Sequence, residues 1–251
     1  MKIGFKEYLL NEVSPHKVEI KFQYHTELNS DIWSRNGDLD PKVRKALLKI
    51  AKEFEEFLET PEMDIKDIIF TGSLANYNYT PQSDIDLHLI ANVTSKEGKP
   101  CKFKIEEFFK AKKTLWNEQH DITIYGYPVE VYVQLADENL VATGIFSIKD
   151  DKWAEKPVMK KDNAKIDKYA TKIKAAEMMS LIDEIIDDKV DDKQSVQKVT
   201  DKIWNMRKAG LASGGEFSVE NIAFKTLRNN GYIEKLIKYR KKIGDEDLSL
   251  D

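Results

Sequence analysis

The sequence predicts an α+β fold over residues 1–155, followed by a helical domain over residues 156–251. Two observations carry this prediction. Short runs with the two-residue alternation of strands occur between residues 65 and 134, interleaved with helical stripes. Beyond residue 155 the apolar residues recur only at helical spacing. We therefore expect an α+β domain first, with an N-terminal extension, and a helical domain after it.

The first domain begins with weaker signals. Residues 4–12 have the pattern of a short amphipathic helix, and residues 18–24 alternate like a strand. Pro41 follows Asp40, which is a helix-start signal, and an apolar stripe then continues from Val43 to Leu58. This stripe predicts a long helix with one buried face.

Four further elements are expected in this domain. Residues 65–71 read as a buried strand that ends at Gly72, and residues 84–90 read as a second strand. Residues 105–118 have a helical pattern. A hairpin is predicted from residues 121–125 and 128–134, with Gly126 and Pro128 in its connection.

The helical domain is predicted to contain several helices in succession. One covers residues 162–189, and a second runs through Val196 and Met206 to stop near Gly210. Ser218 is the expected N-cap of a third helix, which Asn230-Gly231 interrupts before residues 232–243. This domain is expected to close over a cleft in the first domain.

Composition narrows the class of protein. The chain has 251 residues, a net charge of -4 and one cysteine, Cys101, so neither an internal disulfide nor a cysteine zinc site is possible. The net charge does not indicate a dedicated polyanion binder. No apolar run has the length of a membrane span, so we expect no membrane partner and a cytoplasmic location.

The residues that suggest chemistry lie in and after the two predicted strands. Asp84 and Asp86 flank Ile85, and strand alternation places the two acids on one face. Their Cα atoms would lie roughly 6.5–7 Å apart, which lets both carboxylates reach one cation. For the two acids alone, the competing interpretation is an exposed edge strand.

A third acid comes from the later hairpin. Glu130 alternates with Val129 and Val131, so it joins the aspartates if the two strands are neighbours. Clustered carboxylates repel one another unless cations neutralise them, and an all-oxygen ligand set favours Mg²⁺ or Mn²⁺. Gly72 permits close approach of a phosphate to the backbone, and the Ser73 hydroxyl can donate to it. Such a set suits phosphoryl or nucleotidyl transfer.

These motifs resemble a known superfamily. Gly72-Ser73, a gap of about ten residues, Asp84-Ile-Asp86 and a later strand acid resemble the DNA polymerase β-like nucleotidyltransferases. The resemblance implies a small mixed sheet flanked by helices. It also implies metal ligation and catalysis by Asp84, Asp86 and Glu130, and nucleotide-phosphate binding by Gly72 and Ser73. A nucleoside triphosphate such as ATP would be the donor substrate.

A wider resemblance covers most of the chain. Residues 39–44, 143–153, 206–211 and 214–222 look like parts of uncharacterised nucleotidyltransferase-like proteins of tailed phages. The implied function is Mg²⁺-dependent transfer of a nucleoside monophosphate to an acceptor that is a nucleic acid, a protein or a small molecule. In a phage-encoded protein the location would be the host cytoplasm. The alternative is a catalytically silent binding module in phage assembly or host interaction.

His88 and the basic residues between 198 and 242 each have two possible roles. His88 shares the predicted face of Asp86, and a hydrogen-bonded structural histidine is favoured over a substrate contact. Residues 198–242 contain eleven Lys/Arg and four Asp/Glu, which fits either a solvated helical face or a grip on phosphates.

Overall fold

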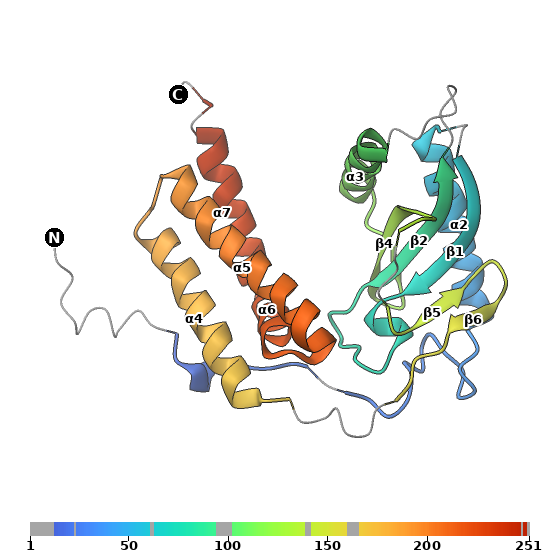
Figure 1. The fold of residues 1–251 in the computed structure, drawn as a ribbon, viewed down its shortest axis with the longest axis horizontal. Coiled ribbons are helices and arrows are strands. Elements are labelled where there is room, and N and C mark those ends of the chain that lie inside the picture. The colour runs from blue at the N-terminus through green and yellow to red at the C-terminus, as the bar shows by residue number, and fades with distance from the viewer. Residues whose placement is uncertain are drawn as a thin grey trace. The chain divides into compact units, whose positions relative to one another are not determined.

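The computed structural model describes residues 13–22, 24–60, 63–93, 102–138, 142–159, 166–246 and 248–249. It divides the chain into two compact units: residues 23–159, and residues 1–22 together with 160–251. Figure 1 labels most of their helices and strands. The assignment of a catalytic domain to residues 1–155 and of a helical domain to residues 156–251 stays a prediction.

The unit of residues 23–159 is built on one mixed sheet of six strands in the order β3-β4-β2-β1-β5-β6. The strands are β1 (Met63–Thr71), β2 (Ile85–Val93), β3 (Thr123–Ile124), β4 (Tyr127–Leu135), β5 (Ile145–Ser147) and β6 (Lys152–Glu155). Only β2 and β4 pair in parallel, and the other neighbours are antiparallel. The predicted α+β fold with a small mixed sheet is therefore confirmed.

Two long helices cover one face of this sheet. Helix α2 (Pro41–Leu58) begins at Asp40, whose carboxylate accepts hydrogen bonds from the backbone of Lys42 and Val43. Helix α3 (Lys102–Gln119) connects β2 to β4, as a parallel pair requires. Both helices contribute to the core together with the buried odd-numbered residues of β2, which are Ile85, Leu87 and Leu89. The even-numbered residues of β2 project from the opposite face.

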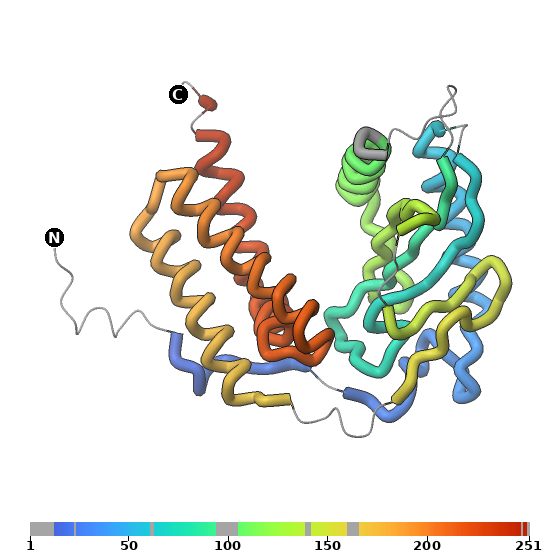
Figure 2. The backbone as a smooth tube through the Cα atoms, viewed as in Figure 1, coloured from blue at the N-terminus to red at the C-terminus, as the bar shows by residue number. Residues whose placement is uncertain are grey.

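The chain path from β1 to β2 can be followed in Figure 2. After β1 the backbone turns at Gly72 into a short 3-10 helix, η2 (Ser73–Ala75), and reaches β2 through residues 76–84. Leu74 and Ala75 are fully buried, and the indole Nε1 of Trp33 donates to the Leu74 carbonyl at 2.7 Å. This connection is thus packed against the core and is not a loose surface loop.

The other unit contains a core of four helices: α4 (Lys168–Asp187), α5 (Lys193–Gly214), α6 (Val219–Asn229) and α7 (Tyr232–Glu246). A 3-10 turn, η3 (Gly215–Phe217), joins α5 to α6, and Ser218 caps α6 as predicted. The N-terminal residues 13–22 belong to this unit, with η1 (Pro15–Lys17) and Val18 packed on its core. Within the described part of the chain, no helix is both long and apolar enough to span a membrane.

Three expectations about individual elements need comment. The strand expected over residues 18–24 is wrong, because residues 18–22 and 24 form no strand and Val18 packs on helices instead. The helix expected over residues 4–12 lies outside the described residues. The hairpin turn consists of Tyr125 and Gly126, both with positive φ, so Pro128 is not in the connection but pairs with Thr123.

Candidate metal centre

Register brings the three predicted acids together. Asp86 of β2 pairs with Glu130 of β4, and Asp84 lies one residue before β2. Asp84, Asp86 and Glu130 each offer a carboxylate oxygen, and these three oxygens all lie within 4.8 Å of one another. All three residues are half-buried, so the cluster is partly accessible to solvent. The expected juxtaposition of the three residues is thus present.

The spacing of the oxygens fits a small divalent cation. Mg²⁺ takes oxygen ligands at about 2.0–2.1 Å, so oxygens on opposite sides of one ion are about 4 Å apart. The observed separations need only small side-chain rotations to reach that geometry. Three carboxylates without sulfur or imidazole ligands also match the preference of Mg²⁺ and Mn²⁺.

Position 72 requires glycine because any side chain there would overlap the carboxylate of Asp86. A Cβ atom at position 72 would lie 1.9 Å from the Asp86 carboxylate oxygen Oδ2. The residue also has φ +83° and ψ -165°, a conformation that is essentially restricted to glycine. The strand therefore turns directly beside the cluster, with its backbone in contact with Asp86.

Ser73 and Ser83 hold the two ends of the connection together. Their hydroxyl oxygens are 2.7 Å apart, and the Ser83 oxygen also accepts from the Thr80 amide at 2.9 Å. If Ser83 donates its proton to Ser73, the Ser73 hydroxyl can donate to a further acceptor. Ser73 is therefore placed and oriented by a partner that directly precedes Asp84.

His25 holds the middle of the connection between β1 and β2 in place. The backbone amide of His25 donates to the Tyr77 carbonyl at 2.7 Å, and its ring nitrogen Nε2 lies 3.1 Å from the Tyr79 carbonyl oxygen. The His25 and Tyr79 rings stack with centroids 3.8 Å apart. Sequence reasoning missed His25, because a lone histidine in an irregular segment carries no periodic signal.

A lysine contacts the third acid. Lys113 of α3 donates from Nζ to the Glu130 oxygen Oε2 at 2.9 Å, and it stands 4.7 Å from the centre of the Tyr132 ring. The two charged side chains are 31% and 43% exposed, so water screens part of this attraction. Sequence reasoning missed Lys113 as well, since one lysine among several on a helix has no distinguishing pattern.

Beyond the acids on the same face lie His88, which is buried, and Tyr132, which is half-buried. His88 is 3% exposed, and its Nδ1 lies 2.8 Å from the Gln134 oxygen Oε1, which agrees with the structural role favoured from the sequence. Burial is the main cause that lowers the pKa of His88 to about 4; the hydrogen bond with Gln134 opposes this shift, and nearby Lys113 adds to it. Burial, with the charges of Asp86 and Glu130, raises the pKa of the Tyr132 phenol. Both side chains are therefore neutral near pH 7.

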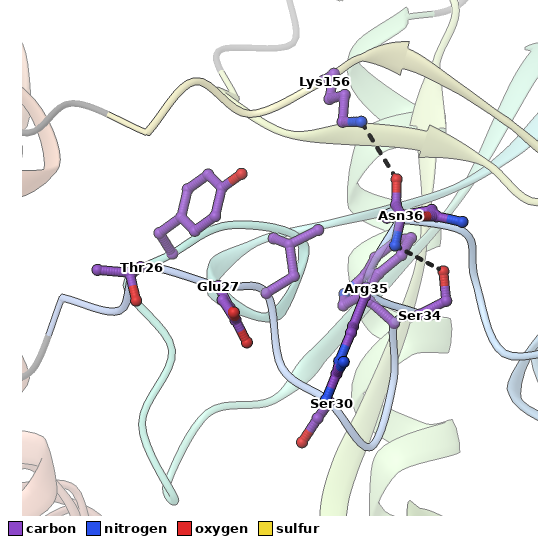
Figure 3. A pocket seen from close by; sticks show the side chains of 11 residues that line it. Thr26, Glu27, Ser30, Ser34, Arg35, Asn36 and Lys156 are labelled. Atoms are coloured by element: carbon purple, nitrogen blue, oxygen red, sulfur yellow. Dashed lines mark hydrogen bonds between the residues drawn. The ribbon is translucent and has the colours of Figure 1, made fainter.

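Two hollows of the same unit differ in their relation to the acids. A polar pocket of about 160 Å³ is lined by residues 26–28, 30, 33–37, 77 and 156, including Arg35 and Lys156 (Figure 3). Its volume is below the range of about 300–1,000 Å³ that is usual for ligand sites. A groove of about 380 Å³ lies between α3 and β4 and includes Lys113 and Tyr132 in its lining. Only this second hollow adjoins the acid cluster through a residue that contacts Glu130.

Taken together, the fold and the cluster define a class of protein. A mixed sheet carries three convergent carboxylates beside a glycine turn, and the oxygens of these carboxylates are spaced closely enough to hold a divalent cation. The chain belongs to the nucleotidyltransferase domain family, whose model matches residues 47–192. No curated protein and no solved structure matched the chain in the same comparisons. The particular resemblance to tailed-phage proteins thus stays a prediction.

Proposed function

We propose that this protein transfers a nucleoside monophosphate from a nucleoside triphosphate to a hydroxyl-bearing acceptor, with Mg²⁺ or Mn²⁺ as cofactor. The single observation that carries the proposal is the convergence of Asp84, Asp86 and Glu130 beside the Gly72 turn. The family match supports a nucleotide substrate. Asp84, Asp86 and Glu130 would hold the metal, and Gly72 and Ser73 would bind the phosphates.

Each of these residues has a distinct task in the proposed reaction. A bound divalent cation supplies neutralisation of the phosphate charge and lowers the pKa of the acceptor hydroxyl. The three carboxylates fix the position of that charge, and Gly72 leaves the backbone free of a side chain there. Ser73 donates a hydrogen bond to a phosphate oxygen when Ser83 is the donor in the hydrogen bond between the two hydroxyls. Positioning and charge neutralisation are most of what nucleotidyl transfer requires.

The test is the substitution Asp86→Asn, which keeps the side-chain shape and removes one charge of the cluster. We expect it to abolish transfer of label from [α-³²P]ATP, or from the other three triphosphates, to acceptors in a bacterial lysate. It should also weaken Mn²⁺ binding measured by electron paramagnetic resonance. The matched control is Asp64→Asn, an exposed aspartate in the same sheet that lies outside the cluster. Undiminished transfer by Asp86→Asn would show that the catalytic assignment is wrong.

The competing proposal is a binding module that retains the fold without turnover, for example in phage assembly. Calorimetry with each nucleotide, with and without Mg²⁺, separates the two. Nucleotide binding without transfer to any lysate component would favour the binding module. Metal-dependent binding together with transfer would favour the enzyme.

A further inference from the structure

The sheet register places the Gly72 turn and Glu130 on opposite sides of β2. Thr71 of β1 pairs with Asp86 of β2, and Asp86 pairs with Glu130 of β4. Neighbouring strand backbones lie about 4.8 Å apart, so the backbones of the Gly72 turn and of Glu130 are on opposite sides of Asp86, about 10 Å from each other. In the proposed function the phosphates lie on the Gly72 side. An in-line displacement brings the attacking oxygen from the side opposite the leaving group, which here is the β4 side.

The groove between α3 and β4 lies on that side. Its volume of about 380 Å³ is within the range usual for binding sites. Lys113 lines the groove and also donates to Glu130, and Tyr132 lines it two residues along β4 from Glu130. A molecule bound there would have its reactive group within reach of the acid cluster.

The lining favours an acceptor that is not a polyanion. Phe109, Val133 and Leu135 give the groove an apolar part, and its four charged residues have balanced signs: Glu106, Lys110, Lys113 and Glu138. The surrounding unit, residues 23–159, contains 17 Lys/Arg and 24 Asp/Glu, for a net charge of -7. Nucleic acids bind proteins largely by pairing phosphates with basic side chains, so they fit this surface poorly.

Strand β4 also presents a backbone edge beside the groove. On the side away from β2, β3 pairs with β4 only at Tyr127 and Pro128, and the Val129 amide bonds the Ile122 carbonyl. Across the ranges that the structure describes, no strand pairs with residues 130–135 on this side. An open strand edge next to an apolar groove is the arrangement that binds extended polypeptides by strand addition.

We propose that the acceptor is a polypeptide segment, which binds in extended form along β4 and places an apolar side chain in the groove. The inference rests on the proposed function and names its acceptor class. A Ser, Thr or Tyr hydroxyl oxygen of the segment forms a bond to the α-phosphorus of the nucleotide. The bond from that phosphorus to the oxygen bridging the β-phosphate breaks, and pyrophosphate leaves with the electron pair. The hydroxyl proton passes to solvent. The product is a phosphodiester between the side chain and the nucleoside.

The test uses a library of 12-residue peptides with a central Ser, Thr or Tyr, and a pool of transfer RNA as the rival acceptor. Each is incubated with the full chain, Mn²⁺ and the four [α-³²P] triphosphates. We expect label on peptides. Val133→Glu, which places a charge in the apolar part, should raise the KM for a labelled peptide at least tenfold. Its Kd for the metal–nucleotide complex, measured by calorimetry, should stay within twofold of the wild-type value.

Two further variants test the role of the groove if Val133→Glu folds poorly. Lys110→Glu changes an exposed rim residue, and it should shift the labelled peptides toward those with basic residues. Lys112→Glu makes the same charge change on the same helix outside the groove, and it should leave peptide preference unchanged. Label on transfer RNA alone, or peptide labelling that none of the groove variants alters, would overturn the inference and leave the proposed function standing. Absence of metal-dependent nucleotide binding by the wild-type chain would remove both.

Discussion

Gly72→Ala is the most informative substitution in the candidate site, because the added methyl group is destabilising for two separate reasons. The first is conformational: φ +83° with ψ -165° costs a residue other than glycine about 1–3 kcal/mol. The second is steric, since the new Cβ would lie 1.9 Å from the Asp86 oxygen Oδ2. The carboxylate must therefore rotate out of the cluster or the turn must move.

The two costs can be measured separately. Urea unfolding followed by tryptophan fluorescence reports mainly on residues 23–159, which contain Trp33, Trp116 and Trp153, three of the four tryptophans. We expect the free energy of unfolding to fall by about 2–4 kcal/mol, the strain plus part of the contact. Displacement of one of three carboxylates should weaken Mn²⁺ binding by about 10–100-fold or more, because misplacing even supporting groups has effects of that size.

Gly126→Ala is the matched control for this prediction. Gly126 has φ +85°, but a Cβ atom there would meet nothing within 4 Å. The control should lose about 1–2 kcal/mol of stability through backbone strain and keep its Mn²⁺ affinity. Unchanged Mn²⁺ affinity in Gly72→Ala would refute the idea that Gly72 exists to admit the Asp86 carboxylate.

Two further predictions concern His88 and Lys113. Unfolded histidine binds a proton near pH 6.5 and folded His88 only near pH 4, so stability should fall by up to about 3 kcal/mol as the pH drops between these values. Urea unfolding at pH 7 and pH 4.5 should show a smaller pH effect in His88→Asn than in the wild type; an equal effect would exclude His88 as a source. Lys113→Met removes a cation 2.9 Å from Glu130, so Mn²⁺ should bind roughly tenfold more tightly by Coulomb's law at a water-like dielectric constant. Lys112→Met, a change of equal charge at a lysine that bonds the Phe57 carbonyl, is its control, and weaker Mn²⁺ binding in Lys113→Met would contradict the electrostatic argument.

The elements with strong periodicity were predictable from sequence because their patterns are local. The apolar stripe after Pro41 gave α2, and the caps at Asp40 and Ser218 gave correct helix starts. The short strands β5 and β6 were not predicted, since three or four residues carry too little alternation to be distinguished from a loop. The strand predicted over residues 18–24 is wrong because alternation also suits an extended segment that packs one side on helices.

The candidate site shows a similar division between local and non-local information. Alternation around Ile85 was sufficient to place Asp84 and Asp86 on one face. The position of Glu130 depended on β4 pairing with β2, a contact that the crossover through α3 establishes over more than forty residues of sequence. The Lys113 contact with Glu130 was beyond prediction, because it depends on how α3 packs beside β4.

The need for glycine at position 72 explains why the Gly72-Ser73 pair and the two aspartates that follow after ten intervening residues behave as one motif. The antiparallel pairing of Thr71 with Asp86 places the residue after β1 against the Asp86 side chain. Any side chain at position 72 would compete for the space that the carboxylate occupies. The hydroxyl contact between Ser73 and Ser83 then fixes the next residue against the one that precedes Asp84. The chain between Ser73 and Asp84 must leave β1, pack against Trp33 through the hydrogen bond to the Leu74 carbonyl, and enter β2 in this register. The number of residues between the two parts of the motif is therefore the length of chain that this connection needs.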